Sequence, residues 1–368
     1  MTVIHLVPAM EQGGVETVVC DLNRALVRAG WRSVVVSSGG RLAEQVRAAG
    51  GEHVALDLKS KNPLTALTRA WKLRGAIRRI GGGLVCAHSR VPAWLYVLAR
   101  KSDARLGALP FITYAHGANS VSAYSAVMTA GDRVIVPSRF LADYLEANYA
   151  SAASGRPSLA SRLRIVRPAV DFSRFDPAKV DPRAVEGLRR AWGLRAGDRV
   201  AMAVGRITPV KGLDHLIRDL AGRLDVAPAA GWADALRAPG TKLVLVGGAE
   251  RGREGHLDAL KGLAASLGVA DRVVFAGAQA DVPACLSLAD LVVSGNVTKP
   301  ESFGLSVAEA LAMDRPVRLL RHFGGAAEIL DAVAAEGRPS RRESVRALCD
   351  PDALSARTRA VYGEVCKI

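Results

Sequence analysis

Two glutamates stand eight residues apart in the segment PESFGLSVAEAL (residues 300–311), where a predicted loop runs into a predicted helix. Glu301 falls at the mouth of that helix and Glu309 two turns inside it, so both carboxylates can accept hydrogen bonds from the hydroxyl groups of a sugar or a ribose. Backbone N–H groups at a helix N-terminus lack helical partners and bind phosphate well. The residues that offer them here are Phe303, Gly304 and Leu305. The ordinary alternative is one glutamate favoured by the helix dipole and a second one on the surface.

Two cations lie in the segment GRITPVKGL (residues 205–213), which leaves a predicted strand and begins a helix. Arg206 offers a forked pair of donors and Lys211 a point charge, and both can stabilise the negative charge that develops on a departing diphosphate. Solvated side chains at a helix start would explain the same residues, although a lysine is unfavourable beside the positive end of a helix.

Two further motifs follow predicted strands in the first half of the chain. Gly13 and Gly14 lie at a strand–helix turn, where glycines let a ligand approach the backbone closely, although an ordinary tight turn uses such a pair as often. His116 ends a strand in the sequence YAHG, where it could contact a substrate or could be structural. No P-loop sequence G-x-x-x-x-G-K-[ST] is present.

These motifs need a scaffold, and short strands rich in Val and Ile alternate with amphipathic helices along the chain, which is typical of parallel sheets covered on both faces. The first half has these predicted strands: Val3–Val7, Ser33–Ser38, His53–Leu58, Leu84–Ser89, Phe111–His116, Arg133–Ser138 and Leu163–Arg167. The second half has these: Val200–Gly205, Lys242–Gly248, Arg272–Gly277, Leu291–Ser294 and Pro316–Leu320. The predicted class is α/β, with two facing Rossmann-like, doubly wound domains and a ligand cleft at their strand ends. Residues 226–240, rich in Gly, Pro and Ala, are expected to form a surface loop.

Composition limits the class of protein. The chain has 368 residues, 49 % of them hydrophobic, and no run of about 18 apolar residues that could cross a membrane. Its N-terminus lacks the charged and apolar regions of a signal peptide. Five scattered cysteines without a C-x-x-C pair argue against a disulfide framework or a zinc site. We therefore expect a cytoplasmic protein with no bound metal.

The formal net charge of +15 is uneven, since residues 1–170 carry +12 and residues 171–368 only +3. This asymmetry predicts an anionic partner, although an arginine-rich genome would also raise the charge. Basic residues are dense between positions 59 and 80, and Leu64, Leu67, Trp71 and Ile77 recur there at helical spacing. Such a basic amphipathic helix can lie on an anionic membrane, or its apolar face can simply pack on the sheet. The residues expected at the acceptor or the membrane are Lys59, Lys61, Arg69, Lys72, Arg74, Arg78, Arg79 and Arg90.

A nucleic-acid partner is disfavoured despite the charge. Only 5 % of the residues are aromatic, and no nucleic-acid-binding motif accompanies the basic run.

Taken together, these motifs resemble glycosyltransferase family 4, a family of retaining enzymes with the GT-B architecture. The residues that carry the resemblance are Gly13-Gly14, His116-Gly117, Val136-Pro137-Ser138, Pro168–Asp171, Gly205-Arg206, Lys211-Gly212, Val246-Gly247-Gly248, Glu301, Glu309, Gly324-Gly325 and Glu328. The segments QGGVE, SKNP and SRVPAW (residues 12–16, 60–63 and 89–94) resemble the branch that builds lipopolysaccharide and other polysaccharides.

The resemblance implies transfer of a hexose or related sugar from a nucleoside-diphosphate sugar, a UDP-sugar first of all, to an anionic glycolipid or glycan such as lipopolysaccharide core. The catalytic residues it implies are His116, Arg206, Lys211 and Glu301. The donor-binding residues it implies are Gly13, Gly14, Gly205, Arg206, Lys211, Gly247, Phe303, Gly304, Leu305 and Glu309. Glu309 would hold the ribose, Glu301 a sugar hydroxyl, and His116 would lie beside the transferred sugar. Neither a metal nor a cofactor is implied, because the leaving phosphate oxygen helps to deprotonate the acceptor.

The strand pattern, the basic segment and the resemblance together set the expected domains and location. We expect an N-terminal, acceptor-binding domain over residues 1–170 and a C-terminal, donor-binding domain over residues 171–350. The last helix, residues 351–368, is expected to return to the first domain. The protein is expected on the cytoplasmic face of the inner membrane as a peripheral enzyme.

The chain departs from the family near the donor side. Asp314 stands where a glycine is usual, residues 318–323 are unusual, and the usual stretch with an Asn-Gly turn is missing after Leu330. A non-catalytic assembly subunit and a GT-B sugar-nucleotide epimerase therefore remain as alternatives. Asp350 and Asp352 match the D-x-D pattern of metal-dependent transferases, but we expect a helix cap there.

Overall fold

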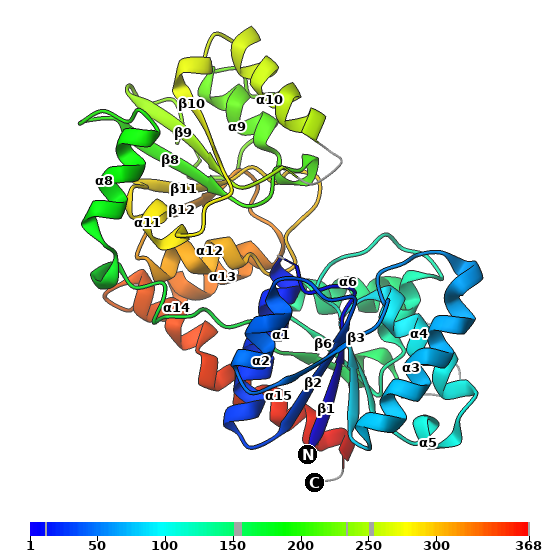
Figure 1. Ribbon diagram of the computed structural model, residues 1–368. Helices are drawn as coiled ribbons and strands as arrows, with labels where there is room; N and C mark the ends of the chain where they lie inside the picture. Colours follow the sequence, from blue (N-terminus) through cyan, green and yellow to red (C-terminus); the bar gives the residue numbers. More distant parts are fainter. Residues whose placement is uncertain (12, 151–156, 233–234, 250–253, 367–368) are drawn as a thin grey trace. The chain divides into compact units, whose positions relative to one another are not determined.

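The computed structural model describes residues 1–11, 13–150, 157–232, 235–249 and 254–366, which divide into two compact units. Unit 1 comprises Met1–Ala169 with Cys349–Ile368, and unit 2 comprises Val170–Leu348. Each unit is a parallel sheet covered by helices (Figure 1). The predicted α/β class with two Rossmann-like domains is therefore confirmed.

Unit 1 is built on a seven-stranded sheet of order β3-β2-β1-β4-β5-β6-β7, with every pair parallel. Its strands are β1 (Thr2–Leu6), β2 (Arg32–Ser37), β3 (Glu52–Ala55), β4 (Leu84–Ala87), β5 (Phe111–Tyr114), β6 (Arg133–Val136) and β7 (Leu163–Ile165). Its helices are α1 (Gly14–Arg28), α2 (Leu42–Ala48), α3 (Ala66–Ile80), α4 (Arg90–Lys101), α5 (Ala104–Gly107), α6 (Arg139–Tyr149), α7 (Leu159–Arg162) and α15 (Pro351–Cys366). All seven predicted strands are present, and each ends one to three residues before its predicted end, where the chain leaves the sheet to form a loop.

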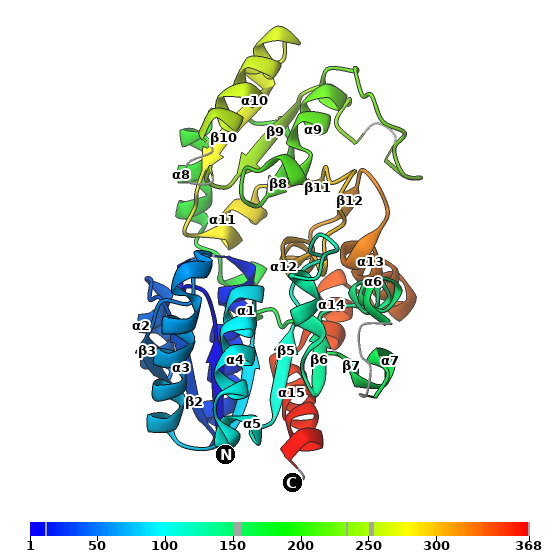
Figure 2. The same cartoon turned by 90° about the vertical axis from the view of Figure 1, so that its right-hand side faces the viewer.

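The two faces of the unit 1 sheet are covered by different helices. Leu73 and Ile77 of α3 pack with Leu95 of α4 against one face. The other face is covered by α1 and α15, and Val361 of α15 packs in the same cluster as Ile112 of β5 (Figures 1 and 2). The last helix of the chain therefore completes the core of the first unit.

Unit 2 is built on a five-stranded parallel sheet of order β10-β9-β8-β11-β12. Its strands are β8 (Arg199–Val204), β9 (Thr241–Val246), β10 (Val273–Gly277), β11 (Leu291–Ser294) and β12 (Val317–Leu319). Its helices are α8 (Pro182–Ala191), α9 (Leu213–Leu220), α10 (Glu254–Ser266), α11 (Val282–Ser287), α12 (Leu305–Ala312), α13 (Gly324–Glu336) and α14 (Arg341–Cys349), the last of which runs one residue past the unit boundary. All five predicted strands of this half are present.

One expectation for unit 2 is wrong in part. The segment expected as a surface loop, residues 226–240, contributes buried side chains to the core, and Trp232 is only 2 % exposed. Its indole Nε1–H donates to the buried carboxylate of Asp219 at 2.9 Å. The buried Trp232 was not predicted, because the glycine and proline content indicates a loop but does not show which side chain points into the core. Residues 233–234 lie outside the described residues.

Among the described helices, none combines the length and the apolarity that crossing a bilayer requires.

Candidate functional site

The loops that follow β8 and β11 begin side by side, because these strands are neighbours in the unit 2 sheet. Lys211 ends a short 3-10 turn after β8, and Glu301 lies in the loop between β11 and α12. Their side chains meet as an ion pair, in which Lys211 Nζ donates to Glu301 Oε1, although the residues are 90 apart in sequence. The fold thus brings together a cation and a carboxylate that the sequence analysis had selected from separate motifs.

A small cavity of about 20 Å³ lies beside this ion pair. Gly205, Lys211 and Glu301 line it together with Asn296, whose side-chain amide donates to Val210 O at 2.9 Å. A cavity of this size holds about one water molecule.

Glycines hold the backbone of these loops close together. Gly247 has φ 156°, and a Cβ there would lie 1.9 Å from the carbonyl oxygen of Gly205. Gly304 caps α12 with φ 96°, and a Cβ there would lie 2.9 Å from Ala326 Cβ. A larger residue at either position would be strained and would push the loops apart.

The other donor-binding residues predicted in unit 2 differ in exposure. Leu305 is the first residue of α12, so the helix N-terminus falls where the sequence predicted it. Phe303 is buried, Glu309 is half-buried within α12, and Arg206 is exposed at the end of β8. Neither Arg206 nor Glu309 lines the small cavity.

His116 lies just after β5 in unit 1 and is half-buried. Its ring stacks on Tyr114 with centroids 4.2 Å apart, and its Nε2 lies 2.9 Å from Nδ1 of His88. Burial lowers the pKa of His116 to about 3, so the imidazole is neutral at pH 7. The sequence analysis missed His88 and its neighbour His5, although His88 follows a strand in the same way as His116.

The glycine pair lies at the start of α1. The Gly13 carbonyl accepts hydrogen bonds from the backbone N–H and the hydroxyl of Thr17, each at 3.0 Å. Gly14 is exposed as the first residue of the helix. The Glu16 carboxylate lies against Gly13, where a Cβ would come within 2.6 Å of its Oε2, and Gln12 of the same motif lies outside the described residues.

The basic amphipathic segment divides into a core side and an exposed side. Ile77 packs in the core at 1 % exposed, as the structural alternative required. Leu64, Leu67 and Trp71, by contrast, are 89 %, 74 % and 63 % exposed. They lie on the 3-10 turn Pro63–Thr65 and on α3, with exposed basic side chains around them. The exposed basic residues of the segment are Lys59, Lys61, Lys72, Arg78 and Arg79, and Arg74 is half-buried.

Three of the predicted basic residues are not free on this surface, and one of them, Arg78, pairs through Nε with Asp103 Oδ2 at 2.6 Å. Arg69 is buried, and its guanidinium donates to Ser60 O at 2.7 Å and Asn62 O at 2.8 Å, so it fixes the loop before α3. Its inclusion in the membrane-facing set is corrected, because helical spacing alone did not show that it reaches back to that loop. Arg90 donates to Ser125 Oγ at 3.1 Å and stacks over the ring of Tyr124.

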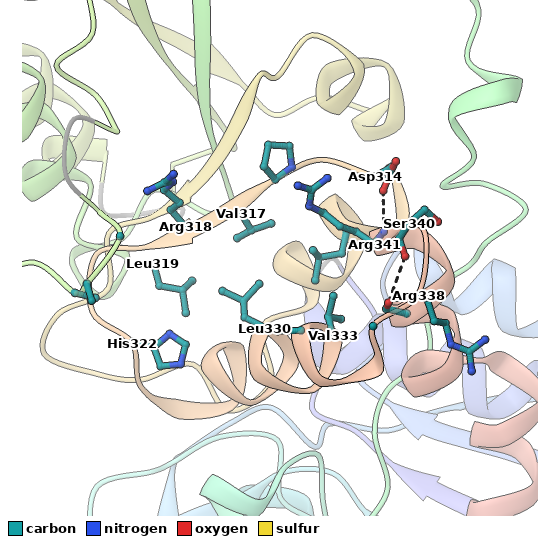
Figure 3. Close-up of a pocket in the computed structure, with 18 of the residues that line it drawn as sticks. Asp314, Val317, Arg318, Leu319, His322, Leu330, Val333, Arg338, Ser340 and Arg341 are labelled. Atoms are coloured by element: carbon teal, nitrogen blue, oxygen red, sulfur yellow. Dashed lines mark hydrogen bonds between the residues drawn. The ribbon is translucent and has the colours of Figure 1, made fainter.

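A larger cavity of about 760 Å³ lies in unit 2 between β12 and α13 (Figure 3). Arg318 and His322 line it with apolar side chains such as Leu330, and none of the predicted site residues does. Asp314, at its rim, has φ 56°, a left-handed conformation that glycine adopts most easily. Its Oδ1 accepts the backbone N–H of Arg341 at 2.9 Å. The departure from glycine at this position therefore keeps a glycine-like turn and adds one side-chain bond.

One group of side chains could in principle hold a metal. Among the described residues it comprises His5, Cys86 and His88, all buried, with candidate ligand atoms within 4.8 Å of one another. Burial raises the pKa of the Cys86 thiol to about 12, and the two histidines bond to each other at 3.0 Å. Because the two imidazoles already bond to each other, these side chains also fit a packed core without a metal. Asp350 is a helix cap as expected, since its carboxylate accepts the N–H of Asp352 at 2.8 Å.

Two family models match this chain. Residues 12–174 match the model described as Glycosyltransferase Family 4, and residues 185–337 match Glycosyl transferases group 1. Curated relatives include a D-inositol 3-phosphate glycosyltransferase of Salinispora arenicola, 38 % identical over 43 % of this chain and 34 % of its own length. The enzyme of that name from Mycobacteroides abscessus is 35 % identical over 52 % of this chain and 37 % of its own length. The matched part of the chain thus spans about a third of the length of these relatives.

Solved structures give the same fold along the whole chain. A glycosyltransferase from Rickettsia africae has a TM-score of 0.79 at 22 % identity and covers 100 % of this chain and 98 % of its own. The Anabaena protein HepE in complex with UDP-glucose has a TM-score of 0.70 at 20 % identity, with 99 % and 95 % covered. WaaG, described as a glycosyltransferase involved in lipopolysaccharide biosynthesis, has a TM-score of 0.62 at 15 % identity, with 99 % and 98 % covered. With the two family models together spanning most of its length, this chain belongs to the glycosyltransferases of the GT-B fold, family 4 in its first half and group 1 in its second.

Proposed function

We propose that this glycosyltransferase transfers a hexose, with retention of configuration, from a nucleoside-diphosphate sugar to an anionic acceptor of the cell envelope. The observation that carries the proposal is the contact between Lys211 and Glu301 at the adjacent ends of β8 and β11. A cation for the diphosphate and a carboxylate for a sugar hydroxyl are the two groups that a nucleotide-sugar site needs. HepE, which has this fold, is described in complex with UDP-glucose, and a UDP-sugar is our first choice of donor.

The chemical role proposed for the cations is stabilisation of the leaving group. Negative charge on the diphosphate grows as the glycosidic bond breaks, so Lys211 and Arg206 bind the transition state more strongly than the ground state. Phe303, Gly304 and Leu305 would present N–H groups at the start of α12 to the same diphosphate, and Glu309 within that helix would bind the ribose. The leaving phosphate oxygen takes the acceptor proton in a front-face substitution, so we propose no enzymic nucleophile and no metal.

The acceptor is proposed to lie at an anionic membrane, with lipopolysaccharide core as the model acceptor. Leu64, Leu67 and Trp71 expose apolar side chains that do not pack in the hydrophobic core of unit 1. Exposed Lys and Arg residues surround them. Such a combination binds the headgroup region of an anionic leaflet, where each basic residue contributes about 1 kcal/mol. We therefore propose a peripheral enzyme on the cytoplasmic face of the inner membrane.

A phosphorylated cyclitol is the second candidate acceptor. It is favoured by the similarity to the D-inositol 3-phosphate glycosyltransferases, which reaches 38 % identity over part of the chain. Both candidates are anionic, in keeping with the basic first half of the chain. They differ in size and in their need for a membrane.

The first experiment is a thermal-shift screen against UDP, GDP, ADP, CMP and their common sugar conjugates, with and without EDTA. A ligand that binds only the folded state stabilises it by about 2.7 kcal/mol at a hundredfold excess over Kd. We expect one nucleotide to raise Tm, with no change on chelation. Lys211→Ala should abolish that shift, and Lys261→Ala, a substitution of an exposed lysine on α10, is the matched control.

Transfer of radiolabelled sugar from the selected donor then identifies the acceptor class. We expect product with truncated lipopolysaccharide core in anionic vesicles and none with free inositol phosphate; the reverse would establish the second candidate. Absence of both nucleotide binding and transfer would favour the non-catalytic subunit, and a changed sugar on the donor without transfer would favour an epimerase.

A further inference from the structure

Three histidines from three neighbouring strands form a continuous hydrogen-bonded row in unit 1. His5 lies in β1, His88 follows β4 and His116 follows β5, and these strands are adjacent in the sheet. His5 Nδ1 lies 3.0 Å from His88 Nε2, and His88 Nδ1 lies 2.9 Å from His116 Nε2. His5 and His88 are 0 % and 2 % exposed, whereas His116 is half-buried at the end of the row.

All three imidazoles are neutral at physiological pH. Burial lowers the pKa of His5 to about 4 and that of His116 to about 3. The pKa of His88 lies well below its ordinary value, first because of burial and then because a charge on either neighbouring histidine would repel its own. Each ring therefore has one nitrogen that donates a hydrogen bond and one that accepts.

Neutral rings in a row permit only two arrangements of their protons. His88 uses both of its nitrogens within the row, so it donates to one neighbour and accepts from the other. If His88 donates through Nδ1, then His5 must donate through Nδ1 and His116 must accept through Nε2, which leaves the proton of His116 on Nδ1. In the opposite arrangement all three protons lie on Nε2. The three rings are thus confined to a common tautomer.

The buried end of the row favours the first arrangement. His5 Nε2 is buried and has no hydrogen-bond partner among the described residues. With the protons on Nε2, this atom would be a buried N–H without an acceptor, and such orphaned donors are rarer in proteins than acceptors with an unused lone pair. With the protons on Nδ1, His5 Nε2 is a bare acceptor.

We propose that His5 and His88 are positioning residues that fix His116 as a neutral donor with its proton on Nδ1. The functional part of this inference rests on the proposed function. The nucleotide sugar and the anionic acceptor both present oxygen atoms, and a fixed, uncharged N–H can bind a sugar or phosphate oxygen without a change of protonation during turnover. His116 then acts by orientation and is not a general base. The row also cannot conduct protons, since it ends at a buried nitrogen with no described partner.

The test reads the tautomers directly by NMR of the full-length protein labelled with 15N-histidine. Nitrogen chemical shifts and one-bond N–H couplings show which nitrogen of each ring is protonated, and single His→Gln variants assign the signals. We expect Nδ1–H for His5, His88 and His116, unchanged between pH 8 and pH 5.5. A proton on Nε2 of any of the three, or titration of any of them near pH 6.5, would overturn the proposal. Bound zinc, which would also shift these signals, is excluded by metal analysis of the same sample.

A kinetic test follows the consequence for His116. In His88→Leu the row is interrupted, so His116 can change tautomer or titrate; we expect kcat to fall about tenfold, as for loss of one oriented hydrogen bond, with little change in KM for the donor. The pH profile should gain an acidic limb that the wild type lacks. Unchanged kcat and an unchanged profile in a folded variant would contradict the positioning role. The NMR result needs no activity, so it stands apart from any failure of the proposed function.

Discussion

The two units place candidate functional side chains at their strand ends with opposite chemistry. In unit 1 the histidines from β1, β4 and β5 are neutral and satisfy one another through hydrogen bonds. In unit 2 the residues from the loops after β8 and β11 are charged, and Lys211 and Glu301 form an ion pair. The side chains of unit 1 are therefore held by hydrogen bonds between uncharged rings, and those of unit 2 by an ion pair, with which a charged ligand can compete.

Lowering the pH is the strongest test of the difference between the neutral histidines of unit 1 and the charged pair of unit 2. The native pKa values of His5 and His116, about 4 and about 3, lie below the ordinary value near 6.5, so the unfolded chain binds protons first as pH falls. The contribution of these neutral histidines to the free energy of unfolding is thus fully present above pH 6.5. It decreases between pH 6.5 and pH 4, by up to about 1.4 kcal/mol per pH unit for each such histidine. Urea unfolding at pH 7, 6 and 5 measures this.

The matched variant removes one histidine of the row itself. In His116→Gln the loss of stability with acid should become shallower, because one such histidine is gone. The same stability at pH 7 and pH 5 in the wild type would mean that the row is protonated in the folded protein, and the contrast between the units would disappear.

Removal of the unit 2 cation should have the next largest effect. Lys211→Ala should lower kcat about 10²- to 10³-fold, the range found when one donor to a developing negative charge is deleted. The folded state should suffer little, because the Lys211–Glu301 pair is partly exposed to solvent. Single-turnover kinetics and urea unfolding of the same variant separate the two quantities. Loss of stability with retained kcat would make the pair structural.

Membrane binding should distinguish unit 1 further. Trp71 is 63 % exposed, and its burial in a headgroup region should contribute about 2 kcal/mol, so Trp71→Ser should weaken binding to anionic vesicles about tenfold or more. Val121→Ser, at a residue 55 % exposed elsewhere in unit 1, is the control. Vesicle sedimentation measures both. Equal binding of wild type and Trp71→Ser would remove α3 from the proposed membrane surface.

Glu309, the carboxylate within α12, should affect nucleotide affinity more than kcat. Glu309→Ala should weaken nucleotide affinity about tenfold, as expected for hydrogen bonds to a charged group, and Arg206→Ala should mainly lower kcat. Calorimetric titration with the nucleotide and steady-state kinetics distinguish these effects. Wild-type values for both variants would refute the assignment of this helix and loop to the donor.

The smallest effect is expected at Asp314. Asp314→Gly keeps the left-handed turn and loses only the bond to the Arg341 N–H, so stability should change by less than about 1 kcal/mol. Asp314→Val should cost more, because a β-branched residue is strained at φ 56°. Thermal unfolding ranks the variants. Equal stability of the glycine and valine variants would show that this turn relaxes freely.

The strands could be predicted because each is an apolar run bounded by turn residues. Lys211 and Glu301 could be selected because each lies in a motif that follows a predicted strand. Their contact could not be predicted, since it depends on the spatial order that makes β8 and β11 neighbours across 90 residues. His88 was missed because a single histidine after LVCA has no distinguishing neighbour in sequence. Arg69 was assigned to the wrong surface, since spacing along a helix does not show that a long side chain turns back to bond with Ser60.

Helix α15 has a consequence for biosynthesis. Its Glu364 accepts hydrogen bonds from Arg133 and Arg164 of the unit 1 sheet at 2.6 Å, and these arginines hold the pKa of Glu364 near 2. Val361 and Tyr362 fill the core of the same unit. On a ribosome, unit 2 is translated in full before residues 351–366 are made, so the first unit to begin translation is the last that can finish folding. A nascent chain interrupted before α15 would expose the part of the apolar sheet face that α15 covers, and such a chain is a natural target for chaperones and proteases.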